Sequence, residues 1–83
     1  MRRAPWRRRG GTMWHDPVKA SEISGLPTRV LRELADEGLL ATYPERGPGE
    51  PRRYREDELL ALKEAVSGHP EVSVSLIRNL AAQ

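Results

Sequence analysis

The stretch GLPTRVLRELADEGLL, residues 25–40, constrains the fold of this chain more than any other stretch. Its apolar residues Val30, Leu31 and Leu34 recur at helical spacing and predict a helix with one buried face. Gly38 ends the helix, because glycine readily takes the left-handed conformation found at helix C-termini. The stretch therefore predicts a tight turn, a short amphipathic helix and a glycine stop.

The opposite face of this helix is polar, and it is basic at its start. Thr28, Arg29 and Arg32 fall in the first turn and a half, and Glu33 and Asp36 follow. The same region of a recognition helix meets base edges and phosphates in the major groove of DNA. The alternative is a solvated face with two i,i+4 ion pairs, Arg29–Glu33 and Arg32–Asp36. The neighbouring segments favour the first interpretation.

A short helix precedes this stretch. Asp16 suits its N-cap and Pro17 its first helical position, while Ile23 points inward. Gly25 supplies the turn between the two helices. This spacing of apolar residues and turn glycine is typical of a helix-turn-helix, in which the second helix is held across the first.

The segment after the second helix is rich in turn residues. Three prolines and two glycines fall within residues 44–51, which excludes a helix there. Residues 41–43 and 52–54 predict two short strands, so the segment forms a wing. Its basic residues outnumber its central acid, Glu50, as contact with phosphates requires. These basic residues are Arg46, Arg52, Arg53 and Arg55. The alternative is a solubilising loop.

Two further helices are predicted after the wing. Residues 55–67 begin with three acids, Glu56, Asp57 and Glu58. The helix dipole and solubility explain these acids better than a carboxylate active site does. Residues 74–82 predict the last helix. The chain is therefore expected to be mainly α with a small β-hairpin: a winged helix-turn-helix of four short helices and one wing. The expected core contains Ile23, Leu26, Leu31, Leu34, Leu39, Tyr54, Leu59, Leu62, Leu76, Ile77 and Leu80.

Residues 1–14, here called the arm, contain five arginines and no acid. A proline, a pair of glycines and the absence of apolar periodicity predict a disordered arm, followed by a single domain over residues 15–83. Basic arms elsewhere enter a minor groove of DNA. The alternatives are a disordered leader and a translation-start artefact, with the protein beginning at Met13. Trp6, among the arginines, is expected to be exposed, and Trp14 to pack on the domain.

The overall composition excludes several kinds of site. The net charge is +2, but the residues after the arm carry nine lysines and arginines against twelve acids. Only local clusters of basic residues can therefore indicate that the chain binds nucleic acid. Without cysteine there is no disulfide or thiolate site, and His15 and His69 lack metal-ligand spacing, so no metal or cofactor is expected. No signal or membrane segment is evident, which favours a cytoplasmic protein.

From Gly25 onward the chain resembles the DNA-binding domain of the MerR superfamily. The family's recognition helix follows roughly G-V-S-x-R-T-L-R-Y-Y-E-x-x-G-L-L. The residues that match it without a gap are Gly25, Arg29, Leu31, Arg32, Gly38, Leu39 and Leu40. The family's wing closes with R-R-Y before an acidic helix, as residues 52–58 do here. Its fourth helix opens near S-L-x-x-I-R-x-L, matched by Ser73, Val74, Ile77, Arg78 and Leu80.

The departures from the family pattern narrow the expected function. Glu33 and Leu34 replace the paired tyrosines, so an acid stands where a phenol faces a phosphate. The sequence ends at Gln83, before the family's dimerising helix and its effector or metal domain. We therefore expect a stand-alone domain like the small excisionases and minimal regulators, with no small-molecule effector.

Together, the residues and the resemblance predict sequence-specific binding of double-stranded DNA by a small transcriptional regulator or a recombination directionality factor (an excisionase). The candidate DNA-binding residues are Thr28, Arg29 and Arg32 on the second helix, Arg46, Arg52, Arg53 and Tyr54 on the wing, and Arg7, Arg8 and Arg9 on the arm. Because one small module offers little interface area, we expect neighbouring copies along DNA or a recombinase or polymerase partner. The alternative is a protein-binding adaptor on a winged-helix scaffold. No nucleophile–base pair or phosphate loop indicates an enzyme.

Overall fold

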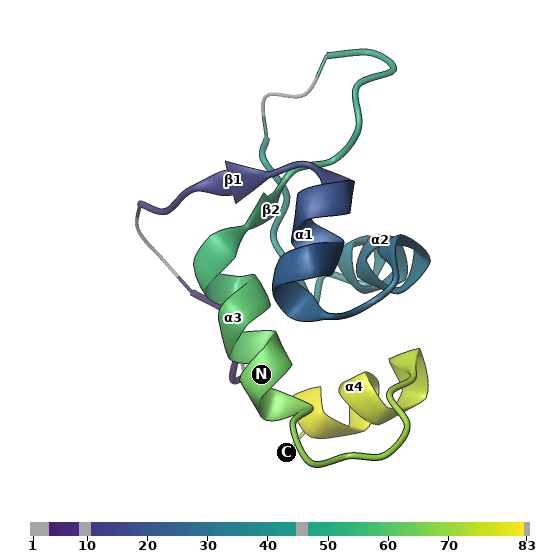
Figure 1. Cartoon of the computed structure of the whole chain (residues 1–83). Helices are drawn as coiled ribbons and strands as arrows, with labels where there is room; N and C mark the ends of the chain where they lie inside the picture. Colours follow the sequence, from purple (N-terminus) through teal and green to yellow (C-terminus); the bar gives the residue numbers. More distant parts are fainter. Residues whose placement is uncertain (1–3, 9–10, 45–46, 83) are drawn as a thin grey trace.

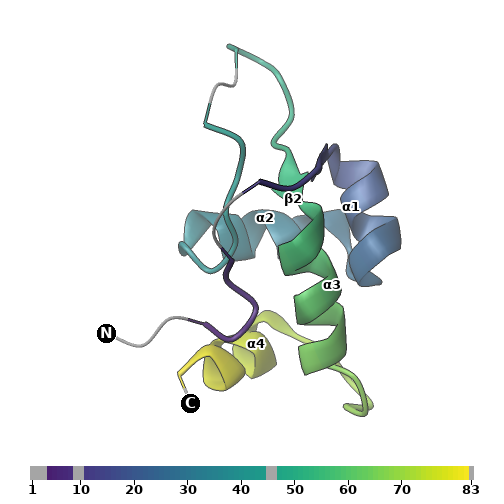
Figure 2. The same ribbon diagram turned by 90° about the vertical axis from the view of Figure 1, so that its left-hand side faces the viewer.

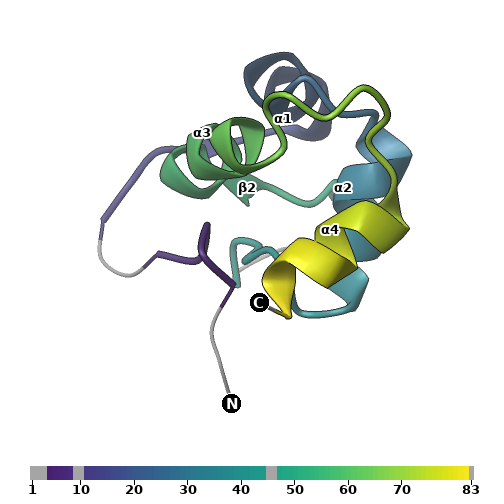
Figure 3. The same cartoon turned by 90° about the horizontal axis from the view of Figure 1, so that it is seen from below.

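The computed structural model describes residues 4–8, 11–44 and 47–82 of the chain (Figure 1). Within these ranges lie four helices and one two-stranded sheet, which confirms the expected mainly helical fold. In chain order the elements are β1 (Trp14–His15), α1 (Pro17–Ser24), α2 (Thr28–Asp36), β2 (Tyr54–Arg55), α3 (Glu56–Ala65) and α4 (Val74–Ala81). α1 packs against both α2 and α3, and α4 lies against α2 (Figure 3).

The helix-turn-helix forms where its capping residues predict it. The Asp16 side chain accepts the backbone N–H of Lys19 at 2.8 Å and so caps α1. Gly25 ends α1 in the left-handed conformation, with a φ of 75°. The Ser21 hydroxyl then donates to the Leu26 carbonyl at 2.6 Å, which ties α1 to the turn. These local hydrogen bonds determine where α1 ends and how the chain turns before α2 crosses it.

The core gathers the apolar faces of the four helices. Of the residues expected there, seven are buried: Leu26, Leu31, Leu34, Tyr54, Leu59, Leu62 and Ile77. Ile23, Leu39 and Leu80 are partly buried against this core. Leu76 is only half-buried, because α4 turns Val74, Ile77 and Ala81 inward and leaves Leu76 at the edge of that stripe.

The strands pair differently from the expected hairpin. The two sides of the wing meet at one isolated bridge, Thr42 to Tyr54, and the Tyr43 N–H donates to the Arg53 carbonyl at 3.0 Å. β2 forms its two-residue ladder with β1 instead, in antiparallel register. Proline lacks the N–H that a ladder needs, and the described residues of the Pro- and Gly-rich stretch, 44 and 47–51, do not extend the pairing. The wing is thus a loop closed at its base (Figure 1).

The N-terminal segment, defined as residues 4–8, packs on the helices, and the prediction that Trp6 is exposed is wrong. Trp6 is fully buried, and its indole Nε1 donates to the Leu39 carbonyl at 2.6 Å. Ala4 is also part of the core. Figure 2 shows the segment between the C-terminal end of α2 and α3, next to α4. Four short helices leave part of the core open, and the large indole fills it.

The buried carboxylate of Glu58 fixes this segment. Glu58 is 1% exposed. One of its oxygens accepts the Arg8 backbone N–H at 2.9 Å and the Arg7 Nε at 3.2 Å, and the other accepts the Ala41 N–H at 2.9 Å. The sequence pattern had indicated that Glu58 serves the helix dipole and solubility. Solubility does not explain this acid, because its carboxylate is buried. It is a buried charge, and a buried charge needs such donors.

Candidate nucleic-acid interface

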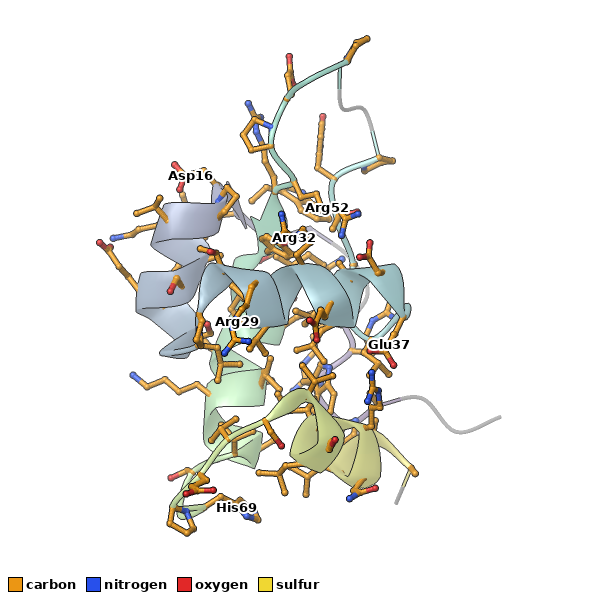
Figure 4. The ribbon with its side chains drawn as sticks, turned by 90° about the vertical axis from the view of Figure 1, so that its right-hand side faces the viewer. Asp16, Arg29, Arg32, Glu37, Arg52 and His69 are labelled. Carbon is orange, nitrogen blue, oxygen red and sulfur yellow. The ribbon has the colours of Figure 1, made fainter. Side chains whose placement is uncertain are left out.

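The polar face of α2 is exposed along its length. Thr28, Arg29 and Arg32 are all exposed, and Figure 4 shows Arg32 on the edge toward the wing and Arg29 on the edge toward α4. In the part of the chain that the structure describes, neither arginine forms an ion pair, so the alternative pairs with Glu33 and Asp36 are not formed. Both guanidinium groups are therefore available to an external partner.

The wing's two adjacent arginines have different surroundings. Arg52 donates from Nη1 to the Arg32 carbonyl at 3.0 Å, and its Nη2 lies 2.5 Å from an Asp36 carboxylate oxygen. It thus joins the wing to the C-terminal half of α2. Arg53 is exposed, whereas Arg52 is half-buried, so the two adjacent side chains differ as they do on the opposite sides of an extended backbone. Arg46, the third wing candidate, lies outside the described residues.

Tyr54 packs beneath the wing and is 2% exposed. Burial raises the pKa of its phenol above the ordinary value, and the neighbouring Arg52 and Arg32 guanidinium groups oppose part of that rise. The phenol is consequently protonated at neutral pH. Tyr54 serves as a packing residue at the junction of β2, α2 and the wing.

The base of the wing is braced by a cluster that the sequence only partly indicated. The rings of Trp14 and Tyr43 meet edge to face, with centroids 5.4 Å apart. The Arg55 guanidinium lies 5.7 Å from the Trp14 ring centroid and forms two hydrogen bonds with Asp57, at 3.0 and 2.9 Å. These bonds hold the pKa of the Asp57 carboxyl below its ordinary value. Arg55 is thus buried and paired, and it adds no free charge to the wing.

A groove of about 490 Å³ lies between the helix-turn-helix and the wing. The first turn of α1, the wing-facing edge of α2 and the end of the wing contribute its lining, which is Pro17, Val18, Thr28, Arg32, Pro51, Arg52 and Tyr54. Sequence analysis missed Val18. Its position in α1, on the side of the helix opposite the buried Ala20, was the available signal.

The arm residues that were expected to contact DNA lie elsewhere. Arg7 bonds Glu58 and donates from Nη1 to the Gly38 carbonyl at 2.6 Å, beyond the C-terminal end of α2. Arg8 donates from Nη1 to the carbonyls of Pro5 and Arg7, at 2.7 and 3.0 Å. Neither residue lines the groove. Arg9 lies outside the described residues.

Across residues 4–8, 11–44 and 47–82, no three histidine or acidic side chains are grouped so that they could hold a metal ion. No helix in these ranges has the length and apolar character needed to cross a membrane.

Comparison with known proteins identifies the helix-turn-helix and the wing. A family described as "MerR HTH family regulatory protein" matches residues 18–66, more than half of the chain. The matched span runs from the first turn of α1 to the end of α3, so it contains the exposed face of α2 and every lining residue of the groove except Pro17. No curated protein and no solved structure matches the chain.

Proposed function

Because the chain belongs to the MerR HTH family of regulatory proteins, we propose that it binds double-stranded DNA sequence-specifically, with α2 in the major groove. The guanidinium groups of Arg29 and Arg32 carry this proposal, because they are exposed and form no ion pair within residues 4–8, 11–44 and 47–82. An arginine with free donors can bond both O6 and N7 of a guanine. Thr28, at the N-terminal end of α2, supplies a hydroxyl and a methyl group to the same surface.

The wing supplies contacts to the sugar–phosphate backbone. Arg53 is exposed and free to approach a phosphate, and Arg46 belongs to the same basic loop. Arg52 holds the wing against α2 through the Arg32 carbonyl and Asp36, so we assign it the positioning of the wing. Phosphate contacts set register and affinity, whereas base contacts on α2 set sequence preference.

The size of this surface supports a proposal for the biological role. A single module of this kind buries about 600–1,000 Å² on DNA, which limits its affinity. We therefore propose that the protein acts at repeated sites, beside further copies of itself, or together with a recombinase or polymerase. A small transcriptional regulator and an excisionase both act in this way.

Binding of a random-sequence duplex pool across a salt series tests the proposal. We expect affinity to fall steeply as salt rises, because phosphate contacts release counterions. Arg53→Ala should weaken this binding and flatten the salt dependence. Lys63→Ala, which removes an exposed charge from α3 away from the groove, is the matched control and should change neither. Absence of binding at low salt would refute the proposal and favour the protein-binding adaptor.

A further inference from the structure

The groove between α1, α2 and the wing has an apolar side. Val18 is 67% exposed, and it lines the groove together with Pro17 and Pro51. α1 buries Ala20 and Ser24, and Val18 lies about 200° around the helix from Ala20. Packing within the described fold therefore leaves the valine methyl groups facing outward, into the groove.

The groove is continuous with the basic surface of α2 and the wing. Thr28 and Arg32, one helical turn apart on α2, line it on one side, and Arg52 lines it on another. Arg52 is paired with Asp36, so the guanidinium group of Arg32 is the charge that favours an anionic strand over a neutral or acidic partner. Its volume, about 490 Å³, lies in the range of sites that accept small molecules, so the edge of a nucleotide can enter.

The base edges in the major groove of unmodified DNA offer one kind of apolar group that can contact this groove of the protein. Thymine alone carries a methyl group there, at C5, and side chains recognise it by apolar contact. Val18 and the methyl group of Thr28 offer that contact beside the cationic Arg32. A cytosine at the same place would present a hydrogen to the valine and lose the contact.

We propose that the groove reads the C5-methyl group of a thymine, with Val18 as the residue that determines this specificity. The inference rests on the proposed binding of DNA by α2 and the wing, and it adds a base preference that the arginines do not supply. It also assigns α1, the first helix of the helix-turn-helix, a direct role in base recognition.

Replacement of thymine by uracil tests the inference, because it removes the methyl group alone. The preferred duplex is first selected from random sequences, and each thymine in it is then replaced in turn by deoxyuridine. At one position the wild-type Kd should rise about fourfold, the factor that corresponds to one methyl-sized group leaving water. Val18→Ala should bind the thymine and uracil duplexes equally.

Leu60→Ala is the matched control, since Leu60 is a 52% exposed apolar residue on α3 that does not line the groove. It should retain the fourfold preference, and thermal melting checks that both variants are folded. Equal binding of all uracil duplexes by the wild type would overturn the inference and leave the DNA-binding function standing. A preference that Val18→Ala retains would place the methyl contact elsewhere and also overturn it.

Two further outcomes count against the inference. A preferred site without thymine would show that the groove does not read this methyl group. Failure to bind any duplex, even at low salt, would instead overturn the proposed function, and the inference with it.

Discussion

Trp6→Ala removes the side chain that joins the N-terminal segment to the core. Trp6 is fully buried and bonds the Leu39 carbonyl. Truncation of a buried aromatic side chain to alanine costs about 3–5 kcal/mol. The free energy of unfolding of a chain this long is about 4–12 kcal/mol, so the loss is a large share of the total. Because each kcal/mol shifts the Tm of a small domain by about 4–8 °C, the Tm should fall by at least about 12 °C.

Circular dichroism at 222 nm, followed against temperature and urea, measures this loss. Trp6→Phe keeps an aromatic ring but lacks the indole N–H, so it should cost only about 1–2 kcal/mol. Pro5→Ala, at an exposed neighbour, is the control and should change the Tm little. A Trp6→Ala variant that melts within about 2 °C of the wild type would refute the reasoning, since it would place Trp6 outside the core.

Three other predictions follow from the ion pairs. Glu58→Gln should lower the free energy of unfolding by about 1–3 kcal/mol in urea titrations, because the carboxylate accepts three hydrogen bonds in a buried position. Arg52→Ala should lower both DNA affinity and Tm, because Arg52 holds the wing, whereas Arg53→Ala should weaken all duplexes equally at an unchanged Tm. The lowered pKa of Asp57 stabilises the fold above the ordinary carboxyl pKa, and this stabilisation is lost as the pH falls through the folded-state value. Asp57→Asn should therefore lower the Tm at pH 7 and flatten its decline in acid.

Local sequence signals were sufficient for the helix-turn-helix. The spacing of Val30, Leu31 and Leu34 sets the buried face of α2, and Asp16 and Gly25 set the ends of α1. These signals act within one or two helical turns, so they can be recognised without the rest of the chain. The exposed basic face of α2 follows from the same periodicity.

Contacts between distant segments were not predictable in this way. Trp6 meets the Leu39 carbonyl across 33 positions, and a single tryptophan in a basic, non-periodic segment gives no signal of burial. β1 has two residues, too few to show strand alternation. Glu58 looked like a capping acid because its donors come from residues 7, 8 and 41, far from it in sequence.

Local sequence patterns predicted part of the candidate site, but not the part that depends on distant segments. Arg29 and Arg32 follow from the helical pattern. The sequence does not show that Arg52 is held against Asp36 while its neighbour Arg53 is exposed. The groove depends on the approach of the α1 N-terminus to the wing, which no local pattern shows. The position of Val18 opposite Ala20 is a local signal of exposure, but its place in the groove depends on the lining that it shares with Pro17 and Pro51.

The central claim is that α2 reads base sequence. The most direct test is whether the Arg32→Ala variant still discriminates between a selected duplex and a scrambled one. The Kd of the wild type and of the variant is measured on the selected duplex and on a scrambled duplex of the same composition. If Arg32 bonds a guanine through two donors, the variant should lose about 1–3 kcal/mol of discrimination. Glu33→Gln, which removes a negative charge from the same exposed face, should bind DNA as well as the wild type or better. Unchanged discrimination by Arg32→Ala would contradict the account.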